Sequence, residues 1–191
     1  MKRTKFPIEL ICSKDQLRPA MTGVLIDNGY AIATDGTILV IMNLEDMQMS
    51  CLSQFDGKII KADVFKRINN SKSYPCVFDG NLYIDSDIIV SPFIDVNFPD
   101  YRSVLSTKNG EIGIIGIDAE KLATIQKAFN CKTLRVSFGE NNNRAMNIKP
   151  AFLVDYDFQA ICMPIYITEP DGSPAKPFTL KAPEYKQLEK A

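Results

Sequence analysis

Short runs of β-branched and other apolar residues, each ended by a tight-turn pair, recur along the chain. The first group covers residues 23–42, where Asn28-Gly29 and Asp35-Gly36 separate three such runs. Asn-Gly and Asp-Gly pairs supply the positive φ angles that tight hairpin turns need. This segment is therefore predicted to be a three-stranded antiparallel meander.

The same pattern returns twice further along the chain. Residues 76–90 repeat it, and aligning Asp35 with Asp85 gives a spacing of 85 − 35 = 50 residues. A looser third copy covers residues 134–165. This spacing is typical of a repeated supersecondary unit, although three unrelated hairpins of an all-β domain would show similar turns.

A helix is predicted before each of the later copies. Residues 62–70 follow a short strand at 58–60 and place apolar side chains on one helical face: Val64, Phe65 and Ile68. Residues 118–130 follow a strand predicted at 112–117 and begin with Asp118, a favourable N-cap residue. Each of these two units is therefore predicted to be strand–helix–three strands.

The first unit departs from this pattern. Residues 8–11 are predicted to be a strand, and the next predicted strand begins at Met21. Residues 13–20 leave room for at most a short turn of helix, because an α-helix rises about 1.5 Å per residue and Pro19 lies near the end. The predicted fold class is α+β, with about three repeated units packed side by side and the first helix stunted.

Composition narrows the chemistry. The 191 residues have a formal net charge of −1 and include no histidine. Ser-His and Cys-His nucleophile pairs and the common zinc-hydrolase sites are therefore excluded. The five cysteines lack CxxC spacing, which favours reduced, mostly buried thiols over disulfides or a zinc site. We expect no catalytic residue, metal or cofactor, and therefore a binding protein rather than an enzyme.

The sequence contains no apolar run long enough for a membrane helix, which needs about 18 residues, and no signal-peptide core at its start. We therefore expect a cytoplasmic protein without a membrane partner.

Three segments resemble the bacterial sliding clamp, the β subunit of the replicative DNA polymerase III. The first is residues 18–25 together with the ATDG turn at 33–36, and the second is 97–105, which contains FPDYR. The third is 161–167, which is similar to the MPMRL end of the family. The resemblance covers residues 6–168 and implies a DNA-clamp-like fold of strand–helix–three-strand units.

The resemblance also implies a division of the chain. Residues 1–105 resemble the middle domain of the clamp, and 106–168 resemble half of its C-terminal domain. Residues 169–191 form a proline-rich, flexible tail beyond the family's end. The family's first domain and the other half of its last domain have no counterpart, so a ring would require a homo-oligomer.

The family's function implies two sites. In such clamps the helices line a hole that holds duplex DNA through phosphate contacts, without reading sequence. The candidate DNA-binding residues are Lys61, Lys66, Arg67, Lys72, Lys121 and Lys127. The same lysines would also suit an ordinary solvated helix face, and neighbouring acidic residues dilute their charge.

The second site is an apolar groove that binds a short peptide of a DNA polymerase or repair protein. Carried over by motif, the groove residues are Met21, Thr34, Gly36, Thr37, Ile38, Leu39, Pro99, Val104, Ile161, Met163 and Pro164. Three of them suit the hydrophobic core equally well: Leu39, Val104 and Ile161. Thr37-Ile38 replaces a frequent His-Arg pair of the family, so partner preference is expected to differ.

The leading hypothesis is a sliding clamp-like processivity factor that tethers a polymerase or repair partner to duplex DNA during DNA replication. The alternative is a ring-less clamp-fold interaction module, a partner-peptide binder or a clamp mimic of a mobile element. A third hypothesis, an enzyme that uses Asp35, Asp85 or Asp100, has little support because aspartate is common in turns. In a further hypothesis, residues 178–180 or 187–188 of the tail dock into the groove and occlude it.

Overall fold

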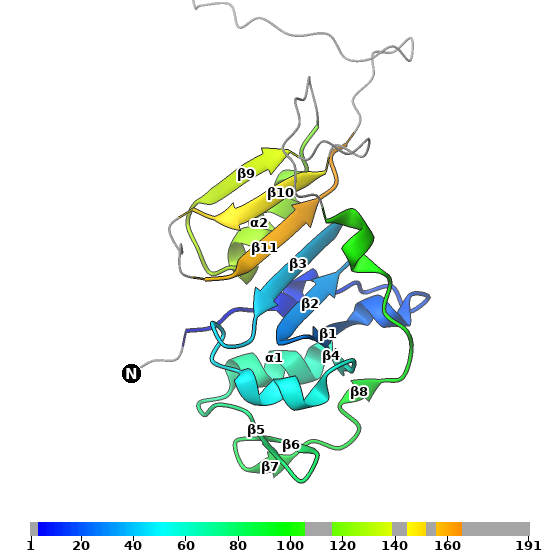
Figure 1. Ribbon diagram of the computed structural model, residues 1–191, viewed down its shortest axis with the longest axis vertical. Coiled ribbons are helices and arrows are strands. Elements are labelled where there is room, and N and C mark those ends of the chain that lie inside the picture. Colours follow the sequence, from blue (N-terminus) through cyan, green and yellow to red (C-terminus); the bar gives the residue numbers. More distant parts are fainter. Residues whose placement is uncertain (1–3, 106–115, 139–144, 152–155, 166–191) are drawn as a thin grey trace, which may run out of the picture.

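In a computed structural model, the described part of the protein comprises residues 4–105, 116–138, 145–151 and 156–165 (Figure 1). Its strands are β1 (Gly23–Asp27), β2 (Tyr30–Thr34), β3 (Ile38–Asn43), β4 (Ile59–Lys61), β5 (Cys76–Phe78), β6 (Asn81–Ile84), β7 (Asp87–Ile88), β8 (Phe93–Ile94), β9 (Leu134–Phe138), β10 (Met146–Pro150) and β11 (Phe158–Cys162). They form an eight-stranded sheet of order β8-β4-β1-β2-β3-β11-β10-β9 and a three-stranded sheet of order β5-β6-β7. The fold is thus mixed α and β, with antiparallel sheets and few helices, as predicted.

The two α-helices begin close to where the sequence predicts them. They are α1 (Ala62–Asn70) and α2 (Ala119–Ala128), and the Asp118 side chain caps α2 by accepting from the backbone N–H groups of Glu120 and Lys121. The described residues also form 3₁₀ helices η1 (Ile8–Ile11), η2 (Pro19–Thr22), η3 (Ser50–Phe55) and η4 (Tyr101–Val104). None of the helices in these ranges has the length and apolar character needed to cross a bilayer.

The predicted strand at 8–11 is wrong, because these residues form η1. Ile8 and Ile11, three residues apart, are buried, whereas Leu10 between them is exposed, as one turn of 3₁₀ helix requires. η1 packs against both α1 and α2. Residues 13–20, where the short first helix was predicted, include only the start of the four-residue 3₁₀ helix η2, so the prediction of at most a short turn there is confirmed.

The hairpin turns follow the sequence, with one difference. The loops between β1 and β2 and between β5 and β6 are two-residue turns with positive φ at both positions, as Asn-Gly and Asp-Gly predict. Between β2 and β3 the loop has three residues, and only Gly36 has a positive φ, of 91°. The side chain of Asp35 instead accepts hydrogen bonds from backbone N–H groups of this turn.

Alternating side chains give the eight-stranded sheet two covered faces. One face packs against η1, α1 and α2 through the buried side chains of Val24, Ile26, Ala31, Ala33, Val40, Met42, Ile148, Phe158 and Ala160. The opposite face carries a second apolar cluster of Leu25, Ile32, Leu39, Ile41 and Ile161, which packs against segment 97–105. Both helices therefore lie on one side of the sheet, and segment 97–105 lies on the other.

The units are adjacent in an order that differs from the sequence. The last strand of the first unit, β3, pairs with the last strand of the third, β11, so these two units share one sheet. The second unit contributes β4 to that sheet, and β8, which follows its meander in the chain, pairs with β4 at the sheet edge. The three meander strands of the second unit form the small β5-β6-β7 sheet. The three units predicted to pack side by side therefore do not form one continuous sheet, because the meander of the second unit forms a sheet of its own.

Several predictions concern residues outside the described ranges. Of the strand predicted at 112–117, Gly116 forms a β-bridge with Ile165, and residues 112–115 lie outside the description. Residues 139–144, within the third copy, and the tail at 169–191 also lie outside it.

Candidate functional site

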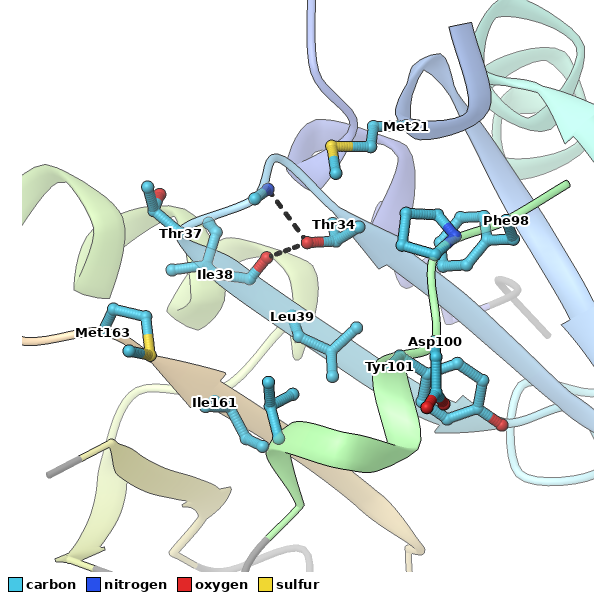
Figure 2. A pocket seen from close by; sticks show the side chains of 13 residues that line it. Met21, Thr34, Thr37, Ile38, Leu39, Phe98, Asp100, Tyr101, Ile161 and Met163 are labelled. Carbon is cyan, nitrogen blue, oxygen red and sulfur yellow. Dashed lines mark hydrogen bonds between the residues drawn. The ribbon is translucent and has the colours of Figure 1, made fainter. Parts of the chain in front are cut away.

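A cavity of about 230 Å³ opens on the face of the sheet opposite the helices (Figure 2). Strands β2, β3 and β11 form its floor, and segment 98–104 forms one wall. Its lining residues are Met21, Thr34, Gly36, Thr37, Ile38, Leu39, Phe98, Pro99, Asp100, Tyr101, Val104, Ile161 and Met163. We call this cavity the groove.

The groove floor depends on strand register. Thr34 lies opposite Leu39 in the β2–β3 pair, and Leu39 lies opposite Ile161 in the β3–β11 pair. Directly opposite residues of an antiparallel pair share a face. A row of side chains therefore crosses three strands and two sequence-distant units, and this row is the floor.

Hydrogen bonds fix the turn at the groove's rim. The Thr34 hydroxyl donates to the Ile38 carbonyl at 2.7 Å and accepts from the Gly36 N–H at 3.0 Å. Asp35 Oδ1 accepts from the N–H groups of Thr37 and Ile38 at 2.7 and 2.8 Å. The Asp35 carboxylate therefore satisfies backbone donors and shapes the rim.

The wall formed by segment 98–104 is held by three side chains that we call the Asp27 cluster: Asp27, Tyr101 and Arg102. Asp27 Oδ2 accepts a 2.5 Å hydrogen bond from the Tyr101 hydroxyl and another from the Arg102 guanidinium. Arg102 also lies 4.9 Å above the Tyr101 ring centroid. Burial and the bond to Asp27 raise the pKa of Tyr101 to about 12, so its hydroxyl remains a donor.

Ten of the eleven residues predicted for the groove line it. Pro164 does not, since the lining at the end of β11 stops at Met163, the residue directly after the strand. Sequence reasoning missed Phe98, Asp100 and Tyr101, although they belong to the same FPDYR segment as Pro99. An aromatic residue on each side of a proline could have indicated them.

The basic residues of the second unit occupy different faces. Lys66, Arg67 and Lys72 are exposed on or just after α1, and Arg67 lies 4.0 Å from Asp87. Lys61 ends β4, where the alternation that points Ile60 toward the helices points Lys61 toward the opposite face. The structure therefore separates Lys61 from the helix face on which it was predicted.

The basic residues of α2 differ in their surroundings. Lys127 is exposed in the last turn. Lys121 lines a hollow of about 420 Å³ between η1 and α2, together with the carboxylates of Asp35, Asp118 and Glu120. The positive charge on this part of the helix face is therefore diluted, as the sequence predicted.

The three aspartates considered for catalysis make structural hydrogen bonds. Besides Asp35, Asp85 accepts from the hydroxyls of Ser71 and Ser73, which lower its pKa. Asp100 accepts from the Arg102 backbone N–H. These bonds account for each carboxylate without a reaction.

The described ranges contain no group of histidine, cysteine, aspartate and glutamate side chains able to hold a metal ion. Burial raises the pKa of the Cys12 thiol to about 12, so it remains protonated at neutral pH.

The eight-stranded sheet with its helices on one face is the fold of bacterial sliding clamps. A DNA polymerase III β subunit from Borrelia burgdorferi superimposes with a TM-score of 0.61 at 12% identity, over 88% of this chain and 64% of that one. A Pseudomonas aeruginosa sliding clamp gives a TM-score of 0.62 at 12% identity, over 87% and 66%. No family model and no curated protein matches the sequence.

A third similar structure bears on the groove. The Helicobacter pylori β clamp, solved bound to a DNA ligase peptide, superimposes with a TM-score of 0.57 at 12% identity, over 83% of this chain and 61% of that one. The present chain thus spans less than two thirds of the length of these clamps. At such low identity, the likeness establishes the clamp fold.

Proposed function

We propose that this protein is a non-catalytic, clamp-like processivity factor that tethers a DNA polymerase or repair partner to duplex DNA. The partner binds in the groove through a short extended peptide, and the helix face contacts DNA phosphates. The observation that carries the proposal is the division of the sheet: a preformed apolar groove lies on one face, and exposed cationic side chains lie with the helices on the other.

The groove has the features of a peptide site. Its lining is mostly apolar, with Met21 and Met163 at opposite sides, and flexible methionines adapt to different side chains. Thr34 and Asp35 hold the rim through hydrogen bonds, so little ordering is needed on binding. A peptide with one or two large apolar side chains fits this chemistry.

The peptide test uses the DNA ligase peptide that the Helicobacter pylori clamp binds, labelled for fluorescence anisotropy. Met163→Ala should weaken binding about tenfold, a loss typical of a central apolar contact. Ile165→Ala is the matched control, because Ile165 is exposed and outside the groove lining. Equal affinity of wild-type protein and Met163→Ala, or no binding at all, would contradict the groove's role.

The DNA test uses a labelled duplex of random sequence. We expect weak binding that declines steeply with salt, because phosphate contacts release counterions. Lys66→Glu should reduce the affinity for DNA and make its dependence on salt concentration less steep. Lys61→Glu, the same charge change on the opposite face, should do neither. Equal losses in both variants would remove the helix face as the DNA surface.

The ring-less interaction module is the second candidate. It is favoured by the carboxylates of Asp35, Asp118 and Glu120 around Lys121, which weaken the helix face for DNA. Peptide binding without duplex binding at low salt would select it over the tether.

A further inference from the structure

The chain leaves the described fold at the edge of the groove. Met163, which follows β11 directly, lines the groove, and its N–H donates to the Thr37 carbonyl at 2.9 Å (Figure 2). Two residues later, Ile165 is held to Gly116 by paired backbone hydrogen bonds of 2.8 and 2.9 Å. Consecutive Cα atoms are about 3.8 Å apart, so Ile165 lies within about 7.6 Å of Met163. Whatever follows Ile165 therefore starts next to the groove.

Residues 166–191 follow this exit point and lie outside the described ranges. One stretch of them, residues 176–181, reads KPFTLK. Phe178 and Leu180 are two residues apart, so they would share one side of an extended chain. Pro177 and Pro183 each disfavour helix for the residue before them. The stretch therefore has two large apolar side chains in the spacing that an extended ligand of the groove requires.

The charge of the groove favours a basic occupant. Among the described residues that line it, Asp100 is the one charged side chain, and it is exposed. Arg18 lies beside the Gly36 turn, but its Nε is 3.7 Å from the carboxylate of Asp15. Arg18 therefore brings no unbalanced positive charge to the rim.

This charge distinguishes between the two stretches of the tail that could dock. Lys176 and Lys181 flank the apolar pair of the first stretch, and residues 176–181 contain no acidic side chain. The second stretch, residues 187–188, lies between Glu184 and Glu189. It would bring carboxylates toward Asp100, so the first stretch is the better match.

The connection to the first stretch is short. Ten residues, 166–175, separate Ile165 from Lys176. A flexible chain of ten residues has a root-mean-square span of about 17 Å, which is more than the distance from Ile165 to the groove. A short connection of this kind gives an effective concentration of about 1 mM at the groove.

We propose that residues 176–181 occupy the groove of their own chain, with Phe178 and Leu180 on its apolar floor and a flanking lysine near Asp100. The inference rests on the groove being a peptide site, as proposed above. A segment with a dissociation constant of about 0.1 mM would fill about 90% of the grooves at an effective concentration of about 1 mM. A partner peptide must displace it, so the apparent affinity of the partner is about tenfold lower than that of the open groove.

The first test measures binding of the labelled DNA ligase peptide to the full chain. The double variant Phe178→Ala/Leu180→Ala should bind it about tenfold more tightly than the wild type. Tyr185→Ala/Leu188→Ala, which also shortens two large side chains of the tail, should bind as the wild type does. Equal affinity of the double variant and the wild type would overturn the inference and leave the groove a peptide site. A gain only in Tyr185→Ala/Leu188→Ala would also overturn it, because the later stretch would then be the occupant.

The second test needs no partner peptide and uses the methionine methyl resonances of the full chain. Met21 and Met163 line the groove, whereas Met42 is buried on the helix side of the sheet. The methyl resonances of Met21 and Met163 should differ between the wild type and the double variant, and that of Met42 should not. A synthetic peptide of residues 174–183, added to the double variant, should return both resonances to their wild-type positions. Groove resonances that are the same in the wild type and the double variant would refute the inference.

Dilution distinguishes binding within one chain from binding to a neighbouring copy. Binding within the chain leaves the wild-type resonances unchanged over an about fiftyfold dilution, because the effective concentration is set by the connection. Resonances that move on dilution toward those of the double variant would mean that a second copy supplies the segment, and the intrachain contact would be refuted. If the methyl resonances behave as expected but no form binds the ligase peptide, the proposed partner function fails and the occupancy by residues 176–181 stands.

Discussion

Asp27 is the residue on which the groove's wall depends. Its side chain is only 16% exposed, and it accepts hydrogen bonds from both Tyr101 and Arg102. Without it, the Tyr101 hydroxyl would lose its acceptor and the wall would be held by apolar contacts alone. One carboxylate on the sheet therefore positions a segment about 75 residues away.

We expect Asp27→Ala to reduce the free energy of unfolding by about 1–3 kcal/mol, the cost of leaving a partly buried donor unpaired. Hydrogen exchange of the amides in 98–104 should accelerate, and peptide affinity should fall. Tyr101→Phe should cost less, because it removes the hydroxyl itself and so leaves no donor unpaired. Unchanged exchange in Asp27→Ala would show that packing alone holds the wall.

Glu9 gives a pH dependence of known sign. Burial raises its carboxyl pKa, and the hydrogen bond from the Asn69 amide offsets only part of that effect. Protonated Glu9 therefore contributes stability that is fully present below its unfolded pKa of about 4.3 and is lost as the pH rises through the folded pKa. At neutral pH the buried charge destabilises the fold.

Glu9→Gln should consequently be more stable than the wild type at pH 7, because the amide carries no charge and can still accept from Asn69. The difference should vanish when both proteins are unfolded with urea below about pH 4.3. A variant that is less stable than the wild type at neutral pH would show that the ionised form is favoured in the fold.

At the scale of elements, Gly23 lets strands β1, β4 and β8 approach closely. A Cβ there would lie 2.6 Å from the Ile60 carbonyl oxygen and 2.9 Å from the Ile94 side chain. The nearer atom belongs to the backbone, so the strands would have to separate. The glycine is required here for space, since its φ is an ordinary extended value of −139°.

We therefore expect Gly23→Ala to lower the free energy of unfolding by about 1–3 kcal/mol, the usual cost of overpacking. Urea denaturation measures it, and Gly29→Asn, at a turn position with open space, is the comparison. A Gly23→Ala protein as stable as the wild type would mean that the sheet edge adjusts freely.

Local sequence signals predicted where the helices and strands lie better than they predicted which elements pack together. The apolar spacing of residues 62–70 and the N-cap at Asp118 located both α-helices, because these signals act within a few residues. Residues 8–11 were misjudged because four apolar-rich residues suit a strand and a 3₁₀ turn equally, and only contact with α1 and α2 decides between them.

Most of the groove could be placed from the sequence because its motifs include the strands of the floor. Phe98 and Tyr101 were missed because only the folded chain shows that they pack against the apolar cluster on this face of the sheet. The pairing of β3 with β11 was equally hidden, since an edge strand's partner depends on the arrangement of whole units.

For the whole molecule, the groove floor exists only while β3 and β11 are paired. Leu39 and Ile161, opposite each other in this pair, are 161 − 39 = 122 residues apart in the chain. A ligand that contacts both residues therefore binds only the folded chain and not the unfolded one. At about a hundred times its dissociation constant it should add about 2.7 kcal/mol to the free energy of unfolding.

Thermal unfolding with and without the DNA ligase peptide measures this effect, and Met163→Ala should abolish most of the rise in midpoint. A midpoint that does not move at saturating peptide would mean that binding does not require the paired strands.

Any compound that contacts both Leu39 and Ile161 on the groove floor thus acts as a reversible cross-link between remote parts of the polypeptide. Melting temperature alone then becomes a label-free assay, so a chemical library could be screened for groove occupants before any natural partner is known.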